Sequence, residues 1–214
     1  MNRQVISTSL SVGLATGLYG VSFGAIGAAA GMTVPAVMLL SLLMFSGASQ
    51  FAFVGIVAAG GAPITAISSA WLMGVRNSFY ALRLSSIISP RGLWRLLAAQ
   101  LSIDESNAVS AAQNGPTNQK LGFWLTGAAV FIFWNTATLL GALAGNLIGS
   151  VEAWGLDGAA AAAFLGLLWP RLKNNLPLAA VGALVALIAI PLTPAGVPVL
   201  LAASVALLPF RSKQ

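Results

Sequence analysis

Residues 35–60 read PAVMLLSLLMFSGASQFAFVGIVAAG, an apolar run longer than the roughly 20 residues that cross a bilayer as a helix. Near its centre it is interrupted by Ser46, Gly47, Ser49 and Gln50. On a helix, with about 100° per residue, Ser46, Ser49 and Gln50 share one face, which inside a bilayer must turn toward protein or a cavity. Two interpretations stay open. Either the face forms hydrogen bonds between packed helices, or Gly47 lets the helix unwind and frees backbone groups to bind a solute.

Apolar runs continue on both sides of this stretch. They cover residues 8–31, 63–88, 92–113, 121–149, 158–170, 176–193 and 197–210. Pro35 and Pro63 stand near the first turns of their runs, where a helix tolerates proline. No run alternates with a period of two, and in hydrocarbon only helices and closed barrels satisfy their own backbone. We therefore predict an all-α integral membrane protein, a bundle of about seven transmembrane helices (six to eight), some broken or re-entrant, in a single membrane-embedded domain over residues 1–214.

The composition supports the same class. Hydrophobic residues make up 58% of the chain and charged residues only 7%, against about 25% charged in soluble domains. The net charge of +6 comes from basic residues between apolar runs, which indicates membrane orientation rather than nucleic-acid binding. The chain has no Cys and no His, which removes the usual metal sites and nucleophile pairs. We therefore expect no metal, no cofactor and no enzymatic activity.

The basic residues also predict an orientation. Arg91, Arg95 and Lys120 flank the run at 92–113, and basic residues follow the runs that end at 170 and 210. The loop at 150–157 is acidic and has no basic residue. The positive-inside rule then puts the C-terminus and Lys120 in the cytoplasm. If the run at 92–113 crosses, the chain has eight spans with both termini inside, but Arg91 and Arg95 lie outside. If it folds back into the bundle, the chain has seven spans and an outside N-terminus, and the charge rule favours this second arrangement in the inner membrane.

Two clusters of polar residues interrupt later runs. Arg76 and Asn77 lie inside the run at 63–88, and Arg76, Tyr80 and Arg83 share a helix face. A guanidinium at this depth is costly, so it should form an ion pair or line a pathway. Asp104 and Glu105 are its natural partners, and a carboxylate in a partly dry site could also carry a proton. The alternatives are an interfacial anchor for Arg76 and a solvated loop or helix cap for the acids.

Glycines recur at intervals of four residues, as in Gly20 and Gly24, Gly27 and Gly31, and Gly141 and Gly145. Such small-xxx-small patterns let helices approach closely. They predict packing within the chain or against a partner subunit.

Three patches resemble a known family. Gly20 to Gly31, followed by FSGASQF at 45–51, is similar to a family signature F-(A/S)-G-(A/S)-(A/S)-Q-F. Arg76 to Leu84 is similar to N-x-R-H-x-x-Y-G, and Asp104-Glu105 to (T)-D-E. In these patches the chain resembles the AzlC-type branched-chain amino acid permeases, the large subunit of a two-component exporter. The chain departs from the pattern at Gly74, where the family has Asn, and at Asn77, where it has His.

The resemblance implies proton-coupled export of a hydrophobic amino acid, with a small AzlD-type membrane subunit as partner. In this hypothesis the substrate path is lined by Ser46, Gly47, Ser49, Gln50, Arg76, Asn77 and Tyr80. Asp104 or Glu105 would couple to protons. The alternative is a membrane subunit that transports nothing and stabilises another complex through its glycine faces.

Overall fold

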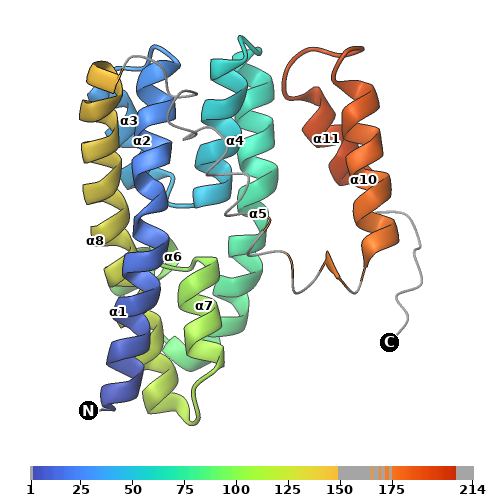
Figure 1. The fold of residues 1–214 in the computed structure, drawn as a ribbon. Coiled ribbons are helices and arrows are strands. Elements are labelled where there is room, and N and C mark those ends of the chain that lie inside the picture. Colours follow the sequence, from blue (N-terminus) through green and yellow to red (C-terminus); the bar gives the residue numbers. More distant parts are fainter. Residues whose placement is uncertain (1, 149–164, 166–168, 170–171, 174, 206–214) are drawn as a thin grey trace.

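The computed structural model describes residues 2–148, 165, 169, 172–173 and 175–205, and every regular element within these residues is a helix. α1 (Arg3–Gly17) and α2 (Tyr19–Ala29) follow each other with a break at Leu18 and run the length of the bundle (Figure 1). Asn2 caps α1, because its side chain accepts a hydrogen bond from the Gln4 backbone N–H at 3.1 Å. The predicted all-helical fold is confirmed for the described residues. The predicted acidic loop at 150–157 lies outside them.

The second predicted run does not cross the bundle. It forms α3 (Val34–Leu43) and α4 (Gly47–Ala58), which are separated by a break at Met44–Ser46. α3 descends to about half the depth, and α4 returns to the end at which α3 began (Figure 1). The two turns at that end contain Gly31 and Gly60, both at positive φ, which glycine adopts without steric cost. We call α3 and α4 the first hairpin.

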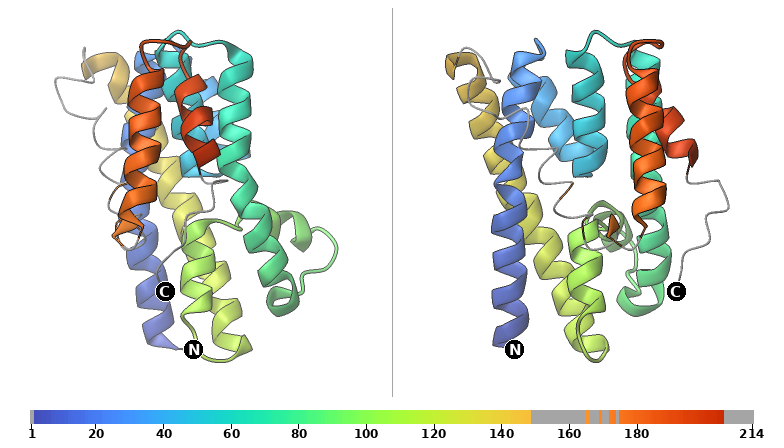
Figure 2. Two further views of the ribbon diagram at one scale, coloured as in Figure 1. Left: turned by 90° about the vertical axis from the view of Figure 1, so that its right-hand side faces the viewer. Right: turned by 45° about the vertical axis from the view of Figure 1, so that its right-hand side comes forward.

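α5 (Pro63–Ile88) then runs back along the bundle as one continuous helix of 26 residues, about 39 Å long at 1.5 Å per residue. Its bounds coincide with the predicted run, and Pro63 stands in the first turn as expected. The predicted run at 92–113 folds back as we expected. It forms α6 (Trp94–Gln100) and α7 (Asp104–Ala111), joined by a break at Leu101–Ile103. We call α6 and α7 the second hairpin, and Figure 2 shows that it returns to the end from which α8 starts.

α8 (Pro116–Ile148) is the longest helix and runs parallel to α1 and α2 (Figure 1). Glycines make this contact close: a Cβ on Gly20 would lie 2.5 Å from the Trp134 carbonyl oxygen, and one on Gly24 would overlap the Thr138 carbonyl. Gly141 meets Val21 and Gly145 meets Ala25 and Ala28 in the same way. These glycines therefore pack within the chain, and Gly27 packs in the same way against Val37 of α3, whereas Gly31 forms a turn.

The chain ends in α10 (Leu176–Ala189) and α11 (Val197–Ser204), which form a further pair beside α5 (Figures 1 and 2). Arg3–Ala29 and Pro116–Gly145 are long and apolar enough to cross a membrane by length and composition. The fold is consistent with a membrane protein, but seven complete spans are not confirmed, since two of the predicted runs double back.

The N-terminus lies at the same end as the segment between α5 and α6, which carries Arg91, and the first turns of α8, which carry Lys120 (Figure 1). The seven-span interpretation put these on opposite sides, because it counted the first hairpin as a complete crossing. α1 and α2 cross to the far end, the first hairpin returns to that end, and α5 crosses back to the end where the chain starts.

Candidate functional site

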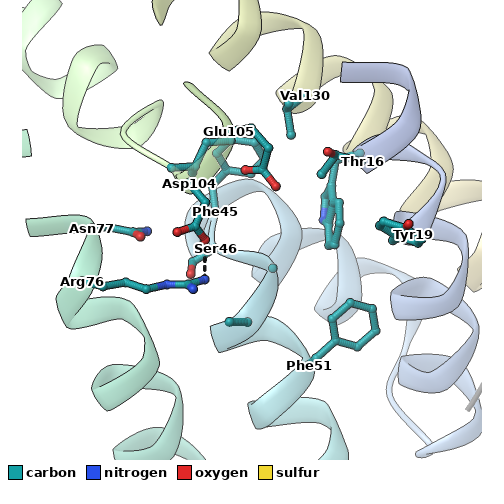
Figure 3. Close-up of a pocket in the computed structure, with 14 residues that line it drawn as sticks. Thr16, Tyr19, Phe45, Ser46, Phe51, Arg76, Asn77, Asp104, Glu105 and Val130 are labelled. Atoms are coloured by element: carbon teal, nitrogen blue, oxygen red, sulfur yellow. Dashed lines mark ion pairs between the residues drawn. The ribbon is translucent and has the colours of Figure 1, made fainter. Parts of the chain in front are cut away.

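The tips of the two hairpins lie about halfway along the bundle, between α5 and the long helices (Figure 1). A pocket lies between these elements, and Figure 3 shows the residues that line it. Every one of these elements contributes to it. The lining residues are Thr16, Tyr19, Phe45, Ser46, Gly47, Ala48, Phe51, Arg76, Asn77, Ile103, Asp104, Glu105, Val130 and Trp134. Of the residues predicted to form a site, the structure brings six together here: Ser46, Gly47, Arg76, Asn77, Asp104 and Glu105.

One side of the pocket is charged. The Arg76 guanidinium on α5 lies 2.6 Å from the Asp104 carboxylate at the start of α7, and the two side chains are 37% and 34% exposed. Tyr80, one turn beyond Arg76 on α5, donates a hydrogen bond of 2.6 Å from its hydroxyl to Asp104 Oδ1. The predicted pairing of Arg76 with an acid is confirmed, with Asp104 as the partner. Tyr80 does not line the pocket itself and contacts Asp104, which does.

Two polar atoms beside this ion pair have no hydrogen-bond partner. Arg76 Nε and Asn77 Oδ1 are both buried and unbonded. Buried polar groups are nearly always paired in native proteins, so unpaired ones in a pocket need a cause such as water or a ligand. The Arg76 Nε–H donor and the Asn77 Oδ1 acceptor are therefore available to a ligand at the charged side of the pocket.

Glu105 follows Asp104 on α7 and points in a different direction, away from Arg76 (Figure 3). Arg76–Asp104 is the one ion pair within the described residues, so Glu105 adds a carboxylate to the pocket without a cation of its own. The two neighbouring acids thus stand in different electrostatic surroundings.

Ser49 and Gln50 lie behind the pocket and do not line it. Ser49 Oγ donates to Ser46 Oγ at 3.1 Å, and its side chain is fully buried. Gln50 is also fully buried, and its Nε2 donates to the Met44 carbonyl at 2.8 Å and to the carbonyls of Leu40 and Ser41 at 3.4 Å. These carbonyls belong to the end of α3, where a helix leaves its last acceptors unsatisfied. Gln50 therefore closes the break in the first hairpin.

The opposite side of the pocket is apolar and was missed by sequence reasoning. Phe45, Phe51, Val130 and Trp134 form it, and apolar residues in an apolar run give no signal that separates a pocket wall from a core. Trp134 did carry a signal. It stands in the middle of a long run, away from the membrane interfaces where tryptophan gathers.

Two helix N-termini also point at the pocket, because α4 begins at Gly47 and α7 at Asp104. The first N–H groups of a helix have no partner within it, and the helix dipole makes this end favourable to negative charge. Broken helices whose ends meet near mid-depth are how many transporters bind ionic groups of a substrate.

All of these residues fall inside one family match. The AzlC protein family model matches residues 11–148, which include the C-terminal part of α1 and all of α2, both hairpins, α5 and α8. The chain belongs to the AzlC family. This family is associated with branched-chain amino acid transport. No curated protein and no solved structure matches the chain.

Two of the positions at which the chain departs from the expected motif, 74 and 77, lie close to the pocket. Asn77 lines it directly. Gly74, one turn before it on α5, faces the first hairpin, since a Cβ on Gly74 would lie 3.2 Å from Ser49 Oγ. An asparagine at position 74 would crowd the Ser46–Ser49 pair, so glycine there permits the close approach of α4 to α5.

Proposed function

We propose that this AzlC protein is a secondary exporter of branched-chain or similar hydrophobic amino acids, coupled to protons and working with a small AzlD-type membrane subunit in the inner membrane. The observation that carries the proposal is the two-sided pocket at mid-depth. One side offers charges and unpaired polar atoms, and the other offers aromatic and aliphatic surface. A zwitterion with an apolar side chain complements both sides.

The groups of such a substrate have evident partners. Its carboxylate fits the Arg76 guanidinium and the N-terminus of α4, and its ammonium fits the Glu105 carboxylate. Asn77 Oδ1 supplies a further acceptor. The side chain would then lie against Phe45, Phe51 and Val130. Burying an isoleucine or leucine side chain contributes about 1.5–3 kcal/mol, which favours such substrates over polar amino acids.

Glu105 supports a route for proton coupling. Its carboxylate lines the pocket outside the Arg76–Asp104 ion pair and is the group proposed to meet the substrate ammonium. A proton on the Glu105 carboxylate would remove the partner of the ammonium, so proton and substrate would occupy the pocket in turn. Export driven by an inward proton gradient requires this exchange. Asp104, paired with Arg76 and 2.6 Å from the Tyr80 hydroxyl, would hold the guanidinium in place.

The distribution of charge supports an orientation. Arg3, Arg91, Arg95 and Lys120 gather at one end of the bundle, whereas the turns at 30–33, 59–62 and 190–196 at the other end carry no charge. The positive-inside rule then places the basic end and the N-terminus in the cytoplasm. α1–α2, α5 and α8 would cross completely, and the first hairpin would enter from outside. The C-terminus is proposed to be cytoplasmic as well.

The test is transport in liposomes that contain the purified chain together with its proposed partner subunit. Vesicles loaded with radiolabelled leucine, isoleucine or valine are diluted into buffer with and without an imposed pH gradient. We expect gradient-dependent movement of these amino acids and none in empty vesicles. Vesicles with either subunit alone show whether the partner is required. If no hydrophobic amino acid moves with both subunits present, the proposed function is wrong.

A further inference from the structure

Trp134 stands at the centre of the apolar side of the pocket. Its side chain is 4% exposed although it lines the cavity. It lies 6.3 Å from the Phe23 ring in a stacked arrangement and meets the Phe51 ring edge-on at 6.1 Å. Aromatic pairs at these separations are attractive in both arrangements. The indole is therefore a fixed part of the wall rather than a mobile side chain.

A hydrogen bond fixes the direction of the indole. Trp134 Nε1–H donates to Gln50 Oε1 at 2.8 Å. The other end of the Gln50 amide is committed to backbone carbonyls at the end of α3, so the amide cannot turn without leaving buried groups unpaired. Through Gln50, the break in the first hairpin therefore determines where the indole lies.

The ring edge is also seated on the hairpin itself. A Cβ added to Gly47 would lie 3.2 Å from Trp134 Cη2, closer than ordinary van der Waals contact. Gly47 is the first residue of α4 and itself lines the pocket. Any side chain at this position would displace the six-membered ring, whereas glycine lets it lie against the hairpin.

We propose that Trp134 sets the size of the side chain that the pocket accepts, with Gln50 as a positioning residue and Gly47 as the seat of the ring. This inference rests on the proposed function and deepens it. The indole forms the wall that a substrate side chain would meet, and its position is determined from two directions by the first hairpin. The selectivity of the pocket for side-chain length is then a property of α8 and the first hairpin, not of the charged groups.

The inference predicts opposite effects from two variants. Trp134→Phe shortens the wall and should shift the preference toward larger side chains, such as phenylalanine over valine. Gly47→Ala adds a methyl group at a position that lines the pocket, 3.2 Å from the indole, and should shift the preference toward smaller ones, such as alanine or valine over leucine. One methylene in an apolar pocket changes discrimination by about 10- to 200-fold. We therefore expect the ratio of transport of large to small amino acids to rise about tenfold in Trp134→Phe and to fall about tenfold in Gly47→Ala.

The experiment measures competition by alanine, valine, leucine and phenylalanine against labelled leucine transport in the reconstituted two-subunit complex. Binding to the purified complex is followed in parallel by ligand-dependent thermal shift, so that a variant with slow transport still reports its preference. Trp124→Phe is the matched control, because Trp124 packs against Trp94 and Phe123 and does not line the pocket. Gln50→Leu should shift the preference as Trp134→Phe does.

Opposite shifts for Trp134→Phe and Gly47→Ala, with Trp124→Phe unchanged, support the inference. Wild-type ratios in both pocket variants overturn it and leave the proposed function standing. Equal loss for every amino acid also overturns it, because a purely structural role predicts a uniform effect. Absence of transport and binding by the wild-type complex would overturn the proposed function and the inference together.

Discussion

The two hairpins have the same architecture and opposite chemistry. Each consists of two half-length helices that meet at a break in the middle of the bundle, and the second helix of each begins at the pocket. The tip of the first hairpin is uncharged. Its amide and hydroxyl groups bind one another, α3 carbonyls and Trp134. The tip of the second carries Asp104 and Glu105, and its bonds reach across to Arg76 and Tyr80 on α5.

This difference indicates a division of roles. A tip whose polar groups are all bonded within the bundle resists rearrangement, because each broken bond leaves a buried group unpaired. The second tip is joined to α5 by one ion pair and one hydroxyl, and a competing carboxylate can release that contact. The first hairpin therefore shapes the pocket, and the second responds to what enters it.

The largest expected effect is an all-or-none difference in cysteine labelling, because the two hairpins are proposed to enter the membrane from opposite sides. The chain has no cysteine, so single cysteines can be introduced without removing others. Ala29→Cys and Ala62→Cys, before and after the first hairpin, should both be labelled by an impermeant maleimide added from outside. Arg91→Cys and Asn114→Cys, before and after the second, should be labelled only after the membrane is opened. Labelling of Ala29→Cys and Ala62→Cys from opposite sides would mean that residues 35–60 cross completely.

The next effect separates the charged tip from the uncharged one. Arg76→Ala removes the partner of Asp104, and we expect transport to fall on the order of 100-fold, equivalent to about 2.7 kcal/mol in the transport barrier. Asp104→Asn should lower proton-driven transport to a similar degree. Arg83→Ala is the control, since Arg83 lies two turns further along α5 and does not line the pocket. Transport by Asp104→Asn at the wild-type rate would show that this charge has no part in transport.

Stability should respond more strongly to the first hairpin. Gln50→Leu leaves the Trp134 indole N–H unpaired in the core and removes the side-chain donor of the Met44 carbonyl, which keeps the Ser46 N–H. An unsatisfied buried group costs about 1–3 kcal/mol, so the melting temperature of the purified protein should fall by several degrees. The Tyr80→Phe protein, in which Arg76 still holds Asp104, should melt closer to the wild type. The reverse order of melting temperatures would contradict the division of roles.

The smallest effect concerns the hydroxyl that holds Asp104. Tyr80→Phe removes one hydrogen bond of 2.6 Å and keeps the ring. A hydrogen bond to a charged group contributes about 1.5–3 kcal/mol, but Arg76 still holds the carboxylate, so we expect a loss of transport of only about three- to tenfold. Transport at the wild-type rate would mean that the Tyr80 hydroxyl plays no part in holding Asp104.

The sequence predicted the parts of this fold that follow from the free-energy cost of placing charged groups in a bilayer. The run at 63–88 became α5 with the same bounds, and the return of residues 92–113 followed from the basic residues on both sides of them. The pairing of Arg76 with an acid followed from the cost of an unpaired guanidinium. The reversal within residues 35–60 was not predictable from hydropathy, because a crossing helix and a doubled-back pair expose the same apolar surface.

The site divides in a similar way. Charged residues inside apolar runs located the polar side of the pocket, but Gln50 was assigned to the pathway and lies behind it. An amide inside an apolar run gives the same sequence signal whether it meets a solute or the free carbonyls of a broken helix. The aromatic side depends on which faces of α4 and α8 come together, and only the packed structure determines that.

The close contact between α2 and α8 limits how this protein can change shape. Gly24 lies against the Thr138 carbonyl and Gly20 against the Trp134 carbonyl, so sliding one helix past the other by a single residue would drive side chains into backbone. α2 and α8 therefore move together as one rigid unit. Any rearrangement that opens the pocket first to one side of the membrane and then to the other is carried by α5 and the two hairpins, which shift relative to that unit.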